Sequence, residues 1–298
     1  MVKKRRKASD MTQEPKAVLC YGDSNTYGLE PLPGGRYPRR VRWTTRLQEQ
    51  LGEGYIVIPE GLSGRTTDFD RVDAPYKRGL PPLKAIIGSH VPVDVFIVML
   101  GTNDCIAEVG ASPEEIAGGM ERFLKAAGEA FEELQGYQPA YILAAPAPVG
   151  PDYANSTDEA VDESMYIKSL QLAGLYEPLA AKYGCTFVDG AGVEISPVDS
   201  EHLTEEGHRQ MAAKMLQAVR SVMEAAGDSV QAEAAADASD QCLQYVITDD
   251  CIGCGYCLAA CPAICIDGTL IPFTIEQEKC RHCGSCAEVC TADAVQLV

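Results

Sequence analysis

Two sets of residues in this 298-residue chain have types and spacings that could carry out chemistry. The first set is a run of cysteines: nine of the 13 lie between Cys251 and Cys290. Such crowding is typical of a disulfide scaffold in a secreted chain or of a metal centre in a reduced compartment. The basic start of the chain is followed by polar residues, without the apolar region of a secretory signal. We therefore expect a metal centre.

The cysteines form an internal repeat. Each half has the pattern C-x2-C-x2-C-x3-C, and a shift of 29 positions superimposes one half on the other. The members are Cys251, Cys254, Cys257 and Cys261 in the first half, and Cys280, Cys283, Cys286 and Cys290 in the second. This pattern is typical of iron-sulfur sites. Zinc is the main alternative, but zinc ribbons separate two C-x2-C pairs by a longer loop, so we favour iron-sulfur.

This segment resembles the bacterial two-cluster ferredoxins throughout, including the Cys261-Pro262 pair that ends the first run. In that family the fourth cysteine of each run binds the other cluster. The resemblance therefore implies a small α+β ferredoxin-type domain with two 4Fe-4S clusters that transfers electrons. The ligands that it implies are Cys251, Cys254, Cys257 and Cys290 for one cluster, and Cys280, Cys283, Cys286 and Cys261 for the other. Thr291 stands where a second Pro is expected, and Cys242 and Cys265 lie outside the ligand pattern.

The second set of residues follows predicted strands in the larger N-terminal part. Its segments are Gly22-Asp23-Ser24-Asn25, Gly61-Leu62-Ser63-Gly64-Arg65-Thr66-Thr67, Gly101-Thr102-Asn103-Asp104 and Asp199-Ser200-Glu201-His202. Because the carboxyl ends of parallel strands meet at one edge of a sheet, we expect these segments to lie close together. Ser24 alone would be weak evidence for a nucleophile, since a serine after a strand is more often a helix N-cap.

A serine, a histidine and an aspartate at this edge could hydrolyse an ester. Ser24 must lose a proton to attack a carbonyl carbon, and a neutral His202 imidazole can accept that proton and later return it to the departing alcohol. Asp199 would fix the tautomer of His202 and stabilise its cation. Among the four histidines, only His202 has an acid three residues earlier in a loop that leads into a helix. We interpret His90 as a helix-end residue and His208 as a surface residue of the last helix.

Together, the four segments resemble the SGNH hydrolases, also called the GDSL esterase family, over roughly residues 16 to 223. The arylesterase-like branch is the most similar, given Arg42-Trp43 and the run from Met99 to Asp104. The resemblance implies a serine esterase that hydrolyses or transfers short acyl groups, such as acetyl, from alcohol, phenol or sugar esters. It also implies an oxyanion hole made by the N–H groups of Ser24 and Gly64 and the side-chain amide of Asn103. A glycine at position 64 would let the acyl group approach the backbone.

The elements that must position these residues alternate along the chain. Short apolar runs rich in β-branched and aromatic residues predict strands at 17–21, 55–58, 95–100, 140–144 and 186–188. Apolar residues at helical spacing predict helices at 41–51, 83–89, 113–134, 162–183 and 205–225. The alternation predicts an α/β fold with helices on both faces of a parallel sheet, and the resemblance makes it a three-layer α/β/α, flavodoxin-like hydrolase domain.

We expect four segments: a basic disordered arm at 1–15, the SGNH hydrolase domain at 16–223, an acidic Ala-rich linker at 224–241 and the ferredoxin-type domain at 242–298. The formal net charge of −18 argues against a nucleic-acid partner, since phosphate backbones require a basic face. No apolar run reaches the length of a membrane span. We expect a cytoplasmic protein whose partners are a small-molecule ester and a redox protein.

Two functions compete at this point. One is an esterase that carries an electron-transfer module. The other is a redox protein in which the hydrolase domain serves as a scaffold or docking unit. The intact set of Ser24, Asn103, Asp199 and His202 favours the esterase, because a retired site would be free to lose one of them.

Overall fold

The computed structural model describes residues 14–31, 35–72, 74–225, 244–261, 263, 265–277, 279–280 and 285–297. Contacts within the chain divide it into two units, Met1–Val230 and Gln231–Val298. Most of the predicted basic arm and most of the predicted acidic linker lie outside the described residues, as do Cys242 and Cys283.

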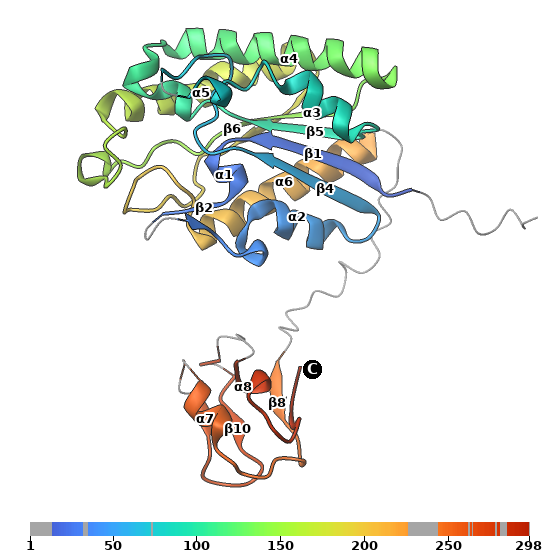
Figure 1. Cartoon of the computed structure of the whole chain (residues 1–298), viewed down its shortest axis with the longest axis vertical. Coiled ribbons are helices and arrows are strands. Elements are labelled where there is room, and N and C mark those ends of the chain that lie inside the picture. The colour runs from blue at the N-terminus through green and yellow to red at the C-terminus, as the bar shows by residue number, and fades with distance from the viewer. Residues whose placement is uncertain are drawn as a thin grey trace, which may run out of the picture. The chain divides into compact units, whose positions relative to one another are not determined.

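The larger unit is built around a five-stranded parallel sheet (Figure 1). Across the sheet, the strands are β4 (Tyr55–Gly61), β1 (Lys16–Gly22), β5 (Val95–Met99), β6 (Ala140–Ala145) and β7 (Thr186–Asp189). Numbered along the chain, this order is 2-1-3-4-5, as in flavodoxin-like folds. The register pairs Gly22 with both Gly61 and Met99, so three strands end at the same level. The five predicted strands are confirmed.

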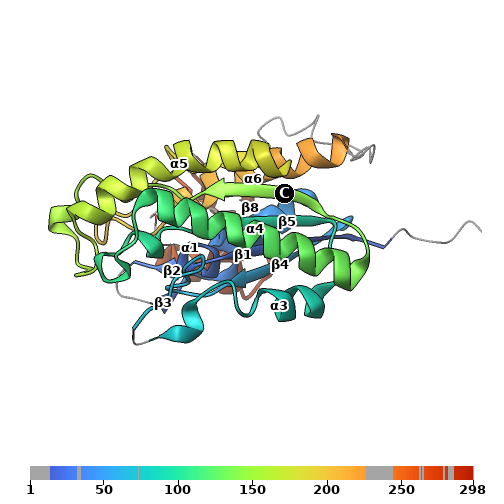
Figure 2. The ribbon, with the colours of Figure 1, turned by 90° about the horizontal axis from the view of Figure 1, so that it is seen from above.

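Helices cover both faces of this sheet (Figures 1 and 2). One face carries α3 (Leu83–His90), α4 (Pro113–Gln135) and α5 (Glu163–Tyr183), and the other carries α2 (Trp43–Leu51) and α6 (Glu205–Ala225). In β1, Leu19 and Tyr21 belong to the first core and Val18 and Cys20 to the second. Strands buried on both faces read as continuous apolar runs, which is why the sequence predicted them. The three-layer α/β/α architecture is confirmed.

Shorter elements connect these layers. They are α1 (Ser24–Tyr27), the hairpin of β2 (Leu29–Glu30) and β3 (Gly35–Arg36), and 3₁₀ turns at Arg39–Val41, Pro75–Lys77, Asn103–Cys105, Ala107–Val109 and Tyr153–Asn155. The long helix α4 begins with a capping box, in which Ser112 Oγ accepts the Glu115 N–H and the Glu115 carboxylate accepts the Ser112 N–H. Both groups satisfy donors that a helix start leaves unpaired.

The smaller unit is an α+β fold of short elements. In chain order they are β8 (Tyr245–Ile247), α7 (Tyr256–Ala260), β9 (Ile266–Asp267), β10 (Thr274–Ile275), α8 (Ser285–Glu288) and β11 (Val295–Leu297). Strand β8 pairs antiparallel with β11, and β9 pairs antiparallel with β10. The apolar core combines Ile266, Phe273 and Val295 with several of the cysteines. The expected ferredoxin-type α+β fold is confirmed. In the described parts of both units, no helix has the length and hydropathy of a membrane span.

Candidate active site and iron-sulfur centre

Ser24, His202 and Asp199 form a hydrogen-bonded line at the carboxyl edge of the sheet. His202 Nε2 lies 2.9 Å from Ser24 Oγ, and His202 Nδ1 lies 2.8 Å from Asp199 Oδ2. All three residues are buried. The structure therefore brings the three predicted residues together in the order nucleophile, base and orienting acid.

The turn after β1 places Ser24 at this edge. The strand ends at Gly22, and Asp23 caps α1 because its Oδ1 accepts the N–H of Asn25 at 3.0 Å. A Cβ on Gly22 would lie 2.1 Å from Thr26 Oγ1, so glycine is needed for the chain to fold back so closely after the strand. Ser24 thus starts a helix that follows the strand at once.

Asn25 joins this helix to the loop that carries the base. Its Oδ1 accepts the N–H of Leu203 at 2.9 Å, and its Nδ2 donates to the carbonyl of Glu201 at 3.4 Å. Both partners flank His202. The side chain of Asn25 therefore holds the nucleophile and the base in fixed relation.

The loop of Asp199 and His202 is a tight turn. Asp199 Oδ1 accepts the N–H groups of Glu201 and His202, both at 3.1 Å, and Ser200 has a left-handed φ of 56°. Burial raises the pKa of Asp199, but its hydrogen bonds with His202 and Glu201 outweigh burial and leave that pKa below its usual value. Burial lowers the pKa of His202, but the Asp199 hydrogen bond and the nearby carboxyls leave it above its usual value. A base strengthened in this way suits proton abstraction near neutral pH.

Gly64 and Asn103 lie beside one another next to this line. Asn103 Nδ2 donates to the carbonyl of Arg65 at 3.2 Å, which places the amide at the Gly64 peptide. Within the described part of the chain, the N–H groups of Ser24 and Gly64 have no hydrogen-bond acceptor. The three predicted oxyanion donors are thus close in the fold, and two of them are free to bind a ligand oxygen.

The space beside Gly64 is taken by another residue. A Cβ at position 64 would lie 2.7 Å from Lys77 Nζ, and Gly64 has a φ of 80°. We expected this glycine to let the acyl group approach the backbone. The structure supplies two further reasons for it, a left-handed backbone and the close approach of the Lys77 side chain.

Three further carboxyls are buried in this region. Asp23 accepts a hydrogen bond from Asn25 and Asp104 accepts two from Thr67, so both bind loop groups as predicted. Burial raises the pKa of Asp23 to about 6 and that of Asp104 to about 7. Burial also raises the pKa of Glu201 to about 7. These groups therefore change charge near neutral pH.

The structure corrects the interpretation of one histidine. His208 is fully buried, its Nδ1 accepts the Trp43 N–H at 3.3 Å, and its ring meets the edge of Tyr37. It is not a surface residue, because it lies on the face of α6 that packs against α2 and the sheet. Burial lowers its pKa to about 4, so the ring stays neutral. His90 is the last residue of α3, as predicted.

Three residues near the site were not singled out in advance. Arg65 is buried, stacks on the Tyr21 ring with its guanidinium carbon 4.1 Å from the centroid, and donates to the carbonyl of Gly22 at 3.0 Å. Arg65 and Glu201 lie inside the motifs that were recognised, so their positions could have been questioned. Lys77 lies 13 residues from Gly64 along the chain, and no local pattern connects the two.

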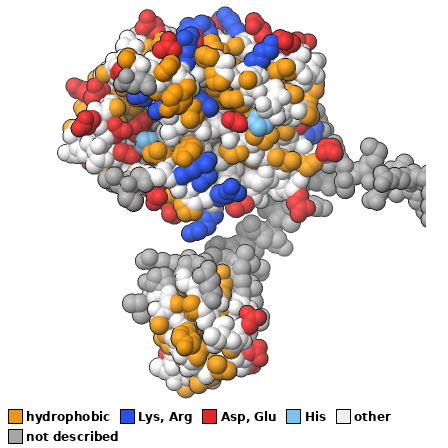
Figure 3. Space-filling view, viewed as in Figure 1, with side chains coloured by type: hydrophobic (Ala, Val, Ile, Leu, Met, Phe, Trp, Pro, Cys, Tyr) orange, Lys and Arg blue, Asp and Glu red, His pale blue; other side chains and the backbone are white. Residues whose placement is uncertain are grey.

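Arginines gather at one side of α1. Arg36, Arg39, Arg40, Arg42 and Arg46 lie between β3 and α2. The Arg36 guanidinium carbon lies 4.0 Å from the ring centroid of Tyr27, the last residue of α1. Figure 3 shows basic side chains grouped over this part of the larger unit. The negative charge of the chain is therefore not spread evenly.

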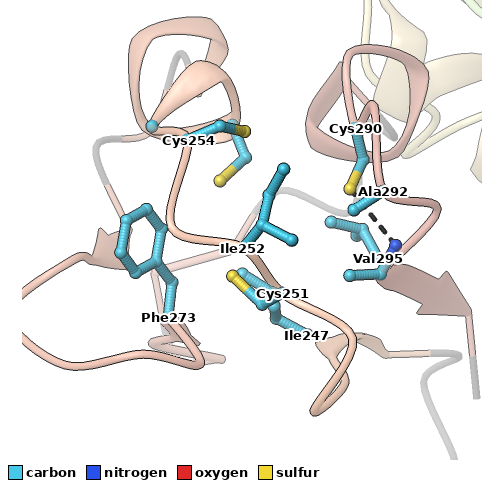
Figure 4. A pocket seen from close by; sticks show the side chains of 11 residues that line it. Ile247, Cys251, Ile252, Cys254, Phe273, Cys290, Ala292 and Val295 are labelled. Carbon is cyan, nitrogen blue, oxygen red and sulfur yellow. Dashed lines mark hydrogen bonds between the residues drawn. The ribbon is translucent and has the colours of Figure 1, made fainter.

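In the smaller unit, four cysteines line one pocket. They are Cys251, Cys254, Cys257 and Cys290, and apolar side chains including Ile252 and Phe273 surround them (Figure 4). The N–H of Ala294 donates to Cys290 Sγ at 3.2 Å. Among the described residues no three His, Cys, Asp or Glu side chains converge on the position of a single ion. Four thiols around an apolar pocket, one of which accepts an N–H, fit a cubane that binds each thiolate at a separate iron.

The second group of cysteines packs in the same core. Cys261, Cys280 and Cys286 all belong to it, and the buried Cys265 has its Sγ 3.4 Å from that of Cys261. Cys283, the fourth member that the sequence predicted, lies outside the described residues. The three described members are consistent in position with a second site.

Comparison with known proteins identifies both units. Residues 20–210 match the model of the GDSL-like Lipase/Acylhydrolase family. The chain belongs to this family. Residues 243–291 match the 4Fe-4S dicluster domain, so the smaller unit is an iron-sulfur domain and not a zinc site. The resemblances inferred from the sequence are confirmed.

The family's solved structures include esterases similar to this chain. The carbohydrate acetylesterase Est24 from Sinorhizobium meliloti is 32% identical, with a TM-score of 0.64 over 70% of this chain and 99% of that one. The native aryl esterase of M. smegmatis is 33% identical, with a TM-score of 0.64 over 69% of this chain and 99% of that one. Carboxylic ester hydrolysis is therefore the reaction class of the larger unit.

The smaller unit has relatives among ferredoxins. A 55-residue stretch is 36% identical to the Ferredoxin 7Fe of Hydrogenibacillus schlegelii, and the match covers 18% of this chain and 70% of that protein. Across the curated relatives that it matches, the chain spans between 18% and 70% of their length.

Proposed function

We propose that this protein is a serine esterase that hydrolyses or transfers short acyl groups, such as acetyl, from alcohol, phenol or sugar esters, and that it carries an electron-transfer module with two 4Fe-4S clusters. The observation that carries the esterase is the pair of contacts at His202, 2.9 Å to Ser24 Oγ and 2.8 Å to Asp199 Oδ2. This geometry lets one imidazole take the serine proton while the aspartate stabilises the cation that results.

The reaction proceeds in two halves. Ser24 Oγ attacks the ester carbonyl carbon as His202 Nε2 takes its proton, and the N–H groups of Ser24 and Gly64 and the Asn103 amide bind the oxyanion. His202 then gives the proton to the departing alcohol oxygen, which leaves an acyl group on Ser24. A water attacks this acyl-enzyme with His202 as base again, and the acid is released. An alcohol in place of water completes a transfer.

The choice of small acyl groups draws on the related structures. One of them is named a carbohydrate acetylesterase and another an aryl esterase. Both names describe esters that differ in the alcohol part. We infer that the acyl part of the substrate is small and that sugar or phenol alcohols are accepted.

Hydrolysis of 4-nitrophenyl esters of increasing acyl length tests the esterase. The wild type should prefer the acetate, and Ser24→Ala should lower kcat/KM by on the order of a thousandfold or more. Ser89→Ala, an exposed serine of α3, is the matched control and should leave the rate unchanged. Equal rates for wild type and Ser24→Ala would refute ester hydrolysis and favour the alternative, a redox protein with a hydrolase-like scaffold.

For the iron-sulfur module we propose the ligand sets implied by the ferredoxin resemblance. Cys251, Cys254, Cys257 and Cys290 would hold one cluster, and Cys280, Cys283, Cys286 and Cys261 the other. The pocket that the first four residues line supports this division, because it joins three cysteines of the first run to the last one of the second. When bound, the clusters supply one-electron transfer to a redox partner protein.

Anaerobic reconstitution tests the cofactor content. With two cubanes, the chain should bind about eight irons and a similar amount of sulfide. About four irons, or zinc in their place, would refute the two-cluster assignment.

The division of the chain supports this combination of activities. We propose a basic arm at 1–15, the hydrolase domain at 16–223, a linker at 224–241 and the ferredoxin-type domain at 242–298, in a cytoplasmic protein. Free thiols suit a reduced compartment, and the described cysteines form no disulfide. Limited proteolysis should cleave within 224–241 and release two stable fragments, whereas cleavage inside either proposed domain would argue against these boundaries.

A further inference from the structure

Glu201 is a buried carboxyl beside the candidate base that the reaction scheme above does not use. It immediately precedes His202 and is 5% exposed. Buried glutamates are rare unless they are paired. Yet no described residue forms a hydrogen bond or an ion pair with its side-chain oxygens. An unpaired carboxyl at this position calls for an explanation.

The backbone of Glu201 is fixed by residues of the site. Its N–H donates to Asp199 Oδ1 at 3.1 Å, and its carbonyl accepts from Asn25 Nδ2 at 3.4 Å. The preceding residue, Ser200, has the left-handed φ of 56° that closes the turn. Because both sides of the residue are held by groups next to Ser24 and His202, Glu201 cannot move away from them without disturbing the site.

Charged and titratable groups surround Glu201 from several elements. They are His202 and Asp199 in its own loop, Asp158 before α5, Asp23 in the turn after β1, and Cys105 in the 3₁₀ turn after β5, on which Lys168 of α5 also acts. Burial and the three aspartates favour the neutral acid, whereas the His202 cation favours the carboxylate. In return, the Glu201 charge raises the pKa of His202. The two groups therefore influence each other directly.

We propose that Glu201 is a positioning residue for the base in the ester hydrolysis proposed above, on which this inference rests. Its carboxylate adds a second negative charge next to His202, besides that of Asp199. This charge stabilises the imidazolium that forms when Ser24 gives up its proton, and so accelerates the attack. The same charge keeps His202 protonated, and thus unable to accept a proton, up to a higher pH.

The two effects have opposite signs, which gives a distinctive pH profile. In Glu201→Gln, the acid limb of kcat/KM should move to lower pH by about one unit, and the alkaline plateau should fall by roughly three- to tenfold. The wild-type and variant profiles should therefore cross. Glu201→Asp keeps the charge and should restore the limb toward its wild-type position. Glu205→Gln, an exposed carboxyl three residues after His202, is the matched control and should leave the profile unchanged.

A second measurement does not depend on turnover. In the full-length Ser24→Ala protein, NMR titration of the imidazole should give His202 a pKa that falls by about one unit when Glu201→Gln is added. Adding Glu205→Gln should not move it. A pKa that stays in place with Glu201→Gln, or profiles that fall without crossing, would overturn the proposal. A wild type without esterase activity but with the NMR shift would instead refute the ester hydrolysis and leave the coupling of the two side chains standing.

Discussion

At the scale of single residues, the site owes its properties to how each carboxyl is solvated. Asp199 accepts three hydrogen bonds and its pKa lies below the usual value, although the residue is buried. Asp23 and Asp104 are also buried, but fewer hydrogen bonds or nearby cations compensate, and their pKa values rise. Burial alone favours the neutral acid, and donated hydrogen bonds reverse that preference. One carboxylate is thus kept charged for His202 while its neighbours carry protons near neutral pH.

Asn103 tests the proposed oxyanion hole. Asn103→Ala should lower kcat by on the order of a hundred- to thousandfold with a smaller change in KM, because the amide contributes mainly when the carbonyl oxygen becomes charged. Steady-state kinetics with 4-nitrophenyl acetate measure both constants. Asn155→Ala, an exposed asparagine of a 3₁₀ turn, serves as the control. A rise in KM alone would show that Asn103 binds substrate without stabilising the oxyanion.

Asp104 makes the stability of the larger unit depend on pH. The folded chain keeps the Asp104 proton up to about pH 7, whereas the usual pKa of the group is 3.8. Between these values folding takes up a proton, so the free energy of unfolding falls as pH rises through this window. Asp104→Asn cannot ionise and should weaken that fall, leaving the smaller part due to Asp23.

Urea unfolding between pH 4 and 8 measures this effect, for wild type and for Asp104→Asn. Trp43 is the single tryptophan of the chain and is buried in the larger unit, so its fluorescence reports that unit alone. Asp152→Asn is an exposed control. The same slope with pH in wild type and Asp104→Asn would show that Asp104 is ionised throughout.

At the scale of elements, one buried carboxylate ties the Gly64 segment to α4. Asp68 Oδ1 accepts from Arg78 Nη2 at 2.8 Å, and its Oδ2 accepts from Arg122 Nε in α4. Asp68 is buried, while both arginines reach solvent. The segment that presents Gly64 is therefore held against a helix of the outer layer.

Asp68→Asn should loosen this segment. We expect the free energy of unfolding to fall by about 1–3 kcal/mol, at the lower end because solvent screens the two arginines. We also expect kcat to fall severalfold as Gly64 loses its position. Asp70→Asn, which removes an exposed carboxylate that contacts the same Arg78, should change neither quantity. Trp43 fluorescence in urea and the acetate assay measure the two effects.

The elements could be predicted from sequence because their signals are local. Alternating faces of β1 and the helical spacing along α4 each record burial within a few residues. The triad residues could be named because their segments follow strands that end at one edge. The roles of Lys77 beside Gly64, of His208 beneath Trp43 and of Asn25 between two loops could not be predicted. Each depends on contacts between residues that are distant along the chain.

At the scale of the whole molecule, the two units have separate cores and separate chemistry. Trp43 and Phe96 belong to the cores of the larger unit, while Phe273 and the cysteines of the ferredoxin-type repeat form the core of the smaller one. Such a division predicts that damage to one centre leaves the other intact.

Cys290→Ser tests both the division and the ligand assignment. Cys290 lies in the second run but shares a pocket with three cysteines of the first. The variant should bind about four irons instead of about eight, and its esterase rate should stay at the wild-type value. Cys185→Ser, a half-buried thiol of the larger unit, is the control for the iron content. Loss of all iron, or a fall in the esterase rate, would contradict the prediction.

The side chain of Asn25 has a consequence for how this sequence can evolve. Its two hydrogen bonds reach the backbone on both sides of His202, at Glu201 and Leu203. Backbone groups are present whatever residues occupy those positions, so substitutions there leave the hydrogen bonds in place, whereas a change at position 25 removes both at once. Among descendants of this sequence, position 25 should therefore tolerate fewer replacements than positions 201 and 203, which can vary in chemistry while the nucleophile and the base stay connected.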